Sequence, residues 1–87
     1  MGDSIDKMEL IKRIASRTGE DTAIVEALVD ATCEEIYAAL KREESVSLRN
    51  FGIFYIDVRH SGTVFKFNPS QRLRALFGWS SSYKGEL

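Results

Sequence analysis

Val46-Ser47-Leu48-Arg49-Asn50-Phe51-Gly52-Ile53-Phe54 is the stretch on which the fold depends. At its start two apolar residues alternate with serines, and a period of two is typical of a half-buried β-strand. The asparagine and glycine in its middle are residues that favour turns. We therefore predict a strand over 46–48, a turn over 49–52 and a second strand from Ile53 onward.

The second strand is predicted to form a hairpin with a third, over 53–60 and 63–68, around the two-residue turn Ser61-Gly62. That loop sets Asp57 opposite Lys66, an opposite-charge pair on one face. The other face gathers apolar side chains, and we expect the helices to cover it. An RNA-stacking platform would instead need these rings to be exposed. The apolar face consists of Phe54, Ile56, Val58, Phe65 and Phe67.

Two helices are predicted before the strands. Asp6 is placed to cap a helix over 7–17, and Gly19 is available as the left-handed residue that ends it. Asp21 caps a longer helix that ends near Lys41. We expect the two helices to pack through the apolar faces that their helical spacing produces.

The apolar stripe of the longer helix is wide. A single short helix cannot cover it, and a chain of 87 residues buries only about 60–65% of its surface. The stripe therefore predicts packing between subunits. Cys33 lies within it and is expected to be a buried structural thiol. The stripe comprises Val25, Leu28, Val29, Thr32, Cys33, Ile36, Tyr37 and Leu40.

A short third helix is predicted over 71–77, with Ser70 as its N-cap. The fold class is thus α+β: two N-terminal helices, a three-stranded antiparallel sheet with a short hairpin, and a short C-terminal helix. We find no internal repeat or linker in the sequence. Residues 1–87 are expected to form a single domain, with a core over 6–77 and a tail over 78–87.

Charge is divided unevenly along the chain. Residues 1–40 carry four basic and nine acidic residues, whereas residues 41–87 carry eight basic and four acidic ones. A basic half predicts a polyanionic partner, and solvated helix faces explain the division equally well.

The sequence has few candidate catalytic residues, since it contains one His and one Cys and lacks a phosphate-binding glycine loop. We expect no enzyme activity, metal, cofactor or small-molecule substrate. Residues 1–6 lack the pattern of a signal peptide, and no apolar run approaches the roughly 20 residues of a membrane helix, so no membrane partner is expected.

Several segments share a family pattern: Lys7-Met8-Glu9-Leu10-Ile11, Thr18-Gly19, Val29-Asp30-Ala31, the stretch 46–54, and Phe67-Asn68-Pro69-Ser70-Gln71-Arg72-Leu73-Arg74. Together they resemble the bacterial HU and integration host factor family, whose last motif is Phe-x-Pro-Gly-Lys-x-Leu-Lys. The resemblance covers roughly residues 6–77. It implies an intertwined homodimer, in the cytoplasm on the nucleoid, whose sheets form a saddle for double-stranded DNA.

The chain departs from this family at the arms. Members reach two long β-ribbons around the minor groove, and a proline near each tip wedges between base pairs. Between Phe54 and Phe67 this chain has room only for a tight hairpin, without an Arg-Asn-Pro tip. We therefore expect a saddle without a ribbon extension, and reduced bending of the DNA.

The resemblance also implies a set of phosphate contacts. Gln71 stands where the family has a lysine, which is expected to weaken the site. Phosphate contacts on the hairpin are inferred from the location of its basic residues, because the family pattern does not supply them. The carried-over contacts are Lys7, Arg49, Asn50, Gln71, Arg72 and Arg74, and the inferred ones are Arg59, His60 and Lys66.

Two functions remain open from the sequence. The first is an HU-like architectural protein that grips DNA phosphates without sequence preference. The second is a dimerisation or adaptor module that kept the fold, lost DNA binding and meets a protein partner through the tail around Trp79 and Tyr83. The net charge of −1 favours this second function.

Overall fold

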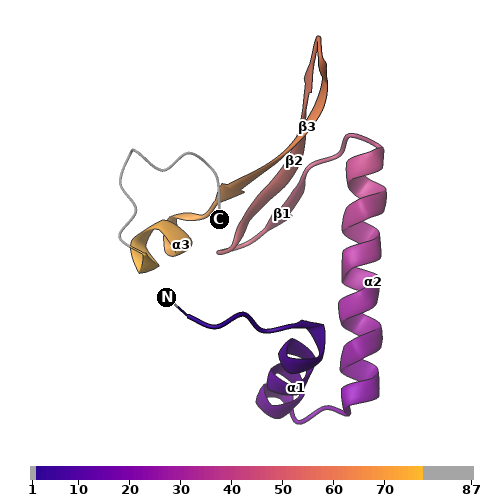
Figure 1. Ribbon diagram of the computed structural model, residues 1–87, viewed down its shortest axis with the longest axis vertical. Helices are drawn as coiled ribbons and strands as arrows, with labels where there is room; N and C mark the ends of the chain where they lie inside the picture. Colours follow the sequence, from indigo (N-terminus) through magenta and orange to yellow (C-terminus); the bar gives the residue numbers. More distant parts are fainter. Residues whose placement is uncertain (1, 78–87) are drawn as a thin grey trace. The chain divides into compact units, whose positions relative to one another are not determined.

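The computed structural model describes residues 2–77 and contains three helices and three strands (Figure 1). The chain forms two compact units that divide within α2, between Glu35 and Ile36. The predicted α+β order of elements is confirmed, whereas the tail over 78–87 lies outside the described residues. The elements are α1 (Lys7–Thr18), α2 (Thr22–Lys41), β1 (Val46–Leu48), β2 (Gly52–Arg59), β3 (Gly62–Pro69) and α3 (Gln71–Leu76).

The ends of the first two helices are fixed by the predicted capping residues. The Asp6 carboxylate accepts a hydrogen bond from the Glu9 amide at 2.9 Å. Gly19 has φ 74°, and its N–H donates to the carbonyl of Ala15. At the start of α2 the Asp21 carboxylate accepts from a backbone N–H of the first turn at 2.8 Å. These caps satisfy backbone groups that the helices leave unpaired.

The core of the first unit is small. It consists of Ile11, Ala15 and Val25, with two further aliphatic side chains packed at its margin. The wide stripe of α2 is mostly uncovered, since Leu28 is 61% exposed. Cys33 is exposed as well, so its expected burial is wrong for the single chain. The reason is that the core of the first unit closes around three side chains and leaves Leu28, Thr32 and Cys33 exposed among residues 2–35.

The second unit is built on an antiparallel sheet in the order β1-β2-β3. Between β1 and β2, the Phe51 N–H donates to the carbonyl of Leu48 at 2.9 Å. Asn50 occupies the third position of this turn with φ 67°, the left-handed conformation that a type II turn requires. The predicted turn is therefore present, although β2 already begins at Gly52.

The hairpin register differs from the predicted one by two residues. Arg59 pairs with Gly62 and Tyr55 with Lys66, so the two-residue loop is His60-Ser61 and the predicted Asp57–Lys66 pair is wrong. A shift of two residues preserves the alternation of a strand. The apolar residues therefore keep their common face, and only their partners across the strands change.

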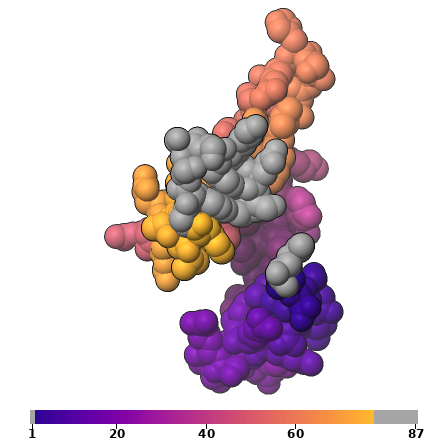
Figure 2. All heavy atoms as spheres, turned by 60° about the vertical axis from the view of Figure 1, so that its left-hand side comes forward, coloured from indigo at the N-terminus to yellow at the C-terminus, as the bar shows by residue number. Residues whose placement is uncertain are grey.

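Beyond β1, the hairpin continues as a two-stranded ribbon. β1 pairs only with Gly52–Phe54, whereas β2 and β3 remain paired as far as Arg59 and Gly62. The hairpin end protrudes in both views (Figures 1 and 2). Five residue pairs at a rise of about 3.4 Å make the ribbon about 17 Å long. The expectation of a saddle without a ribbon extension is therefore wrong, because a short arm exists.

The aromatic side chains of the sheet pack against one another. The rings of Phe54 and Phe67 have centroids 4.8 Å apart, and Phe51 lies 5.6 Å from Phe67. Phe67 is buried, but Phe51 and Phe65 are 44% and 56% exposed. Val58, on the same predicted face, is 60% exposed. The expected coverage of this face is therefore wrong for Val58 and Phe65 in the single chain.

Gly52 lies beneath the Phe67 ring, and a side chain there has no room. A Cβ at this position would come within 2.6 Å of the Phe67 ring and of the Asn68 carbonyl oxygen. We expect Gly52→Ala to lower the free energy of unfolding by about 3 kcal/mol through overpacking and backbone strain. Urea denaturation followed by circular dichroism measures this change.

Gly62→Ala is the matched control. Gly62 also has a positive φ, 129°, but a Cβ there would meet no atom within 4 Å. Backbone strain alone is expected to lower the free energy of unfolding of Gly62→Ala by about 1 kcal/mol. Equal losses in the two variants would contradict the steric role of Gly52.

Candidate nucleic-acid interface

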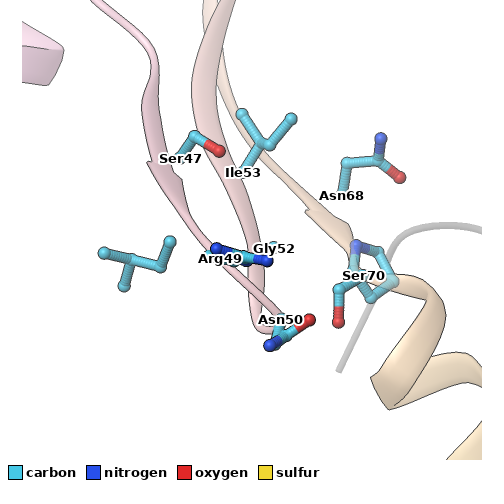
Figure 3. Close-up of a pocket in the computed structure, with 9 residues that line it drawn as sticks. Ser47, Arg49, Asn50, Gly52, Ile53, Asn68 and Ser70 are labelled. Atoms are coloured by element: carbon cyan, nitrogen blue, oxygen red, sulfur yellow. The ribbon is translucent and has the colours of Figure 1, made fainter.

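A shallow hollow of about 200 Å³ lies at one end of the sheet (Figure 3). The β1–β2 turn, the end of β3 and the residue before α3 surround it. The Ser70 N–H donates to the carbonyl of Phe51 at 2.9 Å, and this bond brings the start of α3 to the turn. Among residues 2–77 no carboxylate lines the hollow, and all the polar side chains that line it carry hydrogen-bond donors. They are Ser47, Arg49, Asn50, Asn68 and Ser70.

The residues of α3 divide into two kinds. Gln71 and Arg72 are exposed, and within residues 2–77 neither side chain has a hydrogen bond or ion pair. Arg74 is half-buried instead. Its Nε donates to the carbonyl of Pro69 at 3.3 Å, and its Nη2 donates to Oδ1 of Asn68 at 2.8 Å. Arg74 is therefore tied to the end of β3, whereas Arg72 is available to a ligand.

Lys66 and Arg59 share the outward face of the arm, opposite the phenylalanines. Arg59 donates from Nε and Nη2 to one Asp57 oxygen, each at 3.0 Å. Lys66 has no ion pair within the described residues, and His60 lies exposed in the loop at the tip. The positive charge of Arg59 is thus compensated locally, and that of Lys66 is not.

Lys7 lies in the first unit, where two carboxylates of α2 neutralise it. Its Nζ is 2.8 Å from Asp30 Oδ1 and 3.6 Å from Glu26 Oε2. The hydrogen bond that Lys7 donates to the Asp30 carboxylate raises the pKa of Lys7 above its ordinary value. Lys7 therefore stays protonated but is not an uncompensated cation, and a phosphate would have to displace these carboxylates.

Sequence reasoning missed Ser47, Asn68 and Ser70 as members of this site. Asn68 lies on the same outward face as Lys66, two residues further along β3. This spacing of two residues along a predicted strand could have identified Asn68 as a neighbour of Lys66 on the same face. The serines could not have been found in this way, because only the turn and the bond from Ser70 to Phe51 bring them to the hollow.

The family model described as bacterial DNA-binding protein matches residues 5–72. The chain belongs to this family. Two of its relatives come from Neisseria meningitidis: DNA-binding protein HU-beta of a serogroup A strain and DNA-binding protein HU of a serogroup B strain. Each is 36% identical over 55 residues, which cover 63% of this chain and 62% of the relative. The matched part thus spans less than two thirds of these relatives.

Solved structures of the family have the same fold. HU from Thermotoga maritima superposes with a TM-score of 0.74 at 32% identity, covering 84% of this chain and 98% of that one. A point mutant of the same protein superposes with a TM-score of 0.76 at 32% identity, covering 84% of this chain and 99% of the other. The family recognised from the residues is confirmed. In addition, no helix among residues 2–77 is long and apolar enough to cross a membrane.

Proposed function

We propose that the chain is a non-enzymatic architectural protein that binds double-stranded DNA as a homodimer, in the cytoplasm on the nucleoid. It grips backbone phosphates and reads no base sequence. The observation that carries this proposal is the hollow beside the Arg49-Asn50 turn, because the polar side chains that line it within residues 2–77 offer donors and include no carboxylate. A phosphate diester is an anion whose oxygens only accept hydrogen bonds, so its chemistry matches that lining.

Three cations supply the charge for this contact. Arg49, Lys66 and Arg72 have no ion pair or side-chain hydrogen bond within residues 2–77. They lie respectively at the turn, on the outward face of the arm and on α3. The carboxylates beside Lys7 and Arg59 make those two side chains weaker contributors. Contacts to phosphates position a protein on the duplex without distinguishing bases, so weak sequence preference follows.

A second copy of the chain is the proposed cover for the exposed apolar surface. Leu28, Tyr37 and Phe65 are each more than half exposed. In addition, Tyr37, Leu40 and Ile56 contribute to an apolar hollow of about 330 Å³ within the second unit. Large exposed apolar surface is unfavourable on a small monomer, and burying it between subunits removes it from water.

The short arm supports reduced bending. Its loop is His60-Ser61, and the only proline of the chain, Pro69, lies at the opposite end of β3. Kinking by relatives with long arms depends on an apolar wedge between base pairs. A polar loop on a ribbon of about 17 Å supplies no such wedge, so we expect smaller bends.

Fluorescence anisotropy of a labelled duplex over a series of salt concentrations tests the proposal. Three cations in each protomer give about six phosphate contacts for the dimer, so a plot of log affinity against log salt should have a slope near −5. Binding should be micromolar or weaker at physiological salt. A slope near zero would remove the electrostatic mechanism, and no binding at low salt would favour a dimerisation or adaptor module instead.

A further inference from the structure

Arg74 determines how the side-chain amide of Asn68 is oriented. Nη2 of Arg74 donates to the amide at 2.8 Å, and Nε of the same guanidinium donates to the Pro69 carbonyl at 3.3 Å. A guanidinium has no acceptor, so only the oxygen of the amide can face it. The NH2 group of Asn68 must therefore point away from Arg74, and within residues 2–77 no acceptor takes its two hydrogens.

The surroundings of this NH2 group suit an anion. Asn68 is exposed, and it lines the donor-rich hollow together with Arg49 and Ser70. Figure 3 shows its amide nitrogen turned away from α3. Lys66 lies two residues back along β3 on the same outward face and brings a positive charge to that side of the sheet.

We propose that Arg74 is a positioning residue for DNA binding: it holds Asn68 so that the amide NH2 donates to a backbone phosphate, while Arg74 itself does not contact the DNA. This inference rests on the proposed function. It replaces the direct phosphate contact that the family resemblance implies for Arg74. Half-burial of Arg74 and the use of both Nε and Nη2 within the protein support the indirect role.

Salt dependence separates a positioning residue from a direct contact. Arg72→Gln and Arg74→Gln each remove one charge from α3, so Arg72→Gln is a matched control. Arg72→Gln should flatten the log–log slope of the dimer by about 1.8, because two phosphate contacts are lost. Arg74→Gln should keep the wild-type slope and lower the affinity of the dimer about a hundredfold, since one hydrogen bond to a charged group is lost in each subunit. An equal flattening by Arg74→Gln would overturn the proposal.

A double-mutant cycle gives a second criterion. If Arg74 acts through Asn68, adding Arg74→Gln to Asn68→Ala should cause no further loss of affinity. Arg74→Lys keeps the charge but lacks the planar fork that reaches two acceptors, so it should bind as weakly as Arg74→Gln. Independent, multiplying losses in the cycle, or full affinity in Arg74→Lys, would contradict the positioning role.

The wild-type protein provides a test that does not depend on the folding of any Arg74 variant. The side-chain NH2 resonances of Asn68 are identified by their absence from the spectrum of Asn68→Ala, and they should shift when duplex DNA is added. Unchanged resonances in the presence of bound DNA would refute the contact while leaving DNA binding intact. Absence of wild-type binding at low salt would refute both the contact and the proposed function.

Discussion

Replacing Arg49 and Arg72 with alanine is expected to lower the affinity for duplex DNA by about three orders of magnitude at about 0.1 M salt. The two substitutions remove four contacts from the dimer, and each contact contributes about 0.9 to the log–log slope. The slope should therefore flatten from about −5 to about −2. Fluorescence anisotropy at several salt concentrations measures both quantities.

A double variant with Lys12→Ala and Arg17→Ala is the control for this experiment. It removes the same total charge, from two exposed residues of α1. Loss of net charge alone acts over a distance and is screened by salt, so its effect should be several-fold at most. If the two double variants bind equally weakly, the phosphates are not held at the turn and α3.

Leu28→Glu is expected to destabilise the protein by more than about 3 kcal/mol per subunit. Leu28 is 61% exposed in the single chain, where a glutamate would be tolerated. In a dimer that covers the stripe of α2, the same substitution buries an unpaired carboxylate. Urea denaturation at two protein concentrations, combined with light scattering, measures the loss of stability and of the dimer.

Ala27→Glu provides the matched comparison for Leu28→Glu. Ala27 is the preceding residue, is exposed, and lies outside the apolar stripe. Ala27→Glu introduces the same charge into the same turn of α2, and we expect its free energy of unfolding to change by no more than about 0.5 kcal/mol. Equal stability of the two variants would show that the stripe faces solvent, and the proposed dimer would then need another surface.

The helix boundaries were predictable because their signals are local. Asp6, Asp21 and Ser70 all accept the predicted backbone hydrogen bonds, and Gly19 adopts the left-handed conformation. A cap depends on one side chain and the backbone within three residues of it, so no distant contact is needed to identify it. That residues 1–87 form one domain is still a prediction.

The site was predictable only in outline. The family pattern pointed to the Arg49-Asn50 turn and the start of α3, and the structure places both beside one hollow. The pattern could not show that Arg59 is paired with Asp57, or that Arg74 is tied to Asn68. Such pairings depend on distances between particular atoms, and the sequence does not contain those distances.

The sequence by itself determined which segments are helices and strands, and which side chains share a face of the sheet. Those features follow from periods of 3.6 and 2 and from single capping residues. Only the tertiary structure decided the register of the hairpin and the length of the arm. A shift of two residues leaves the alternation of apolar and polar residues unchanged, so the pattern cannot distinguish the His60-Ser61 loop from Ser61-Gly62. The backbone pairing of Arg59 with Gly62 distinguishes them.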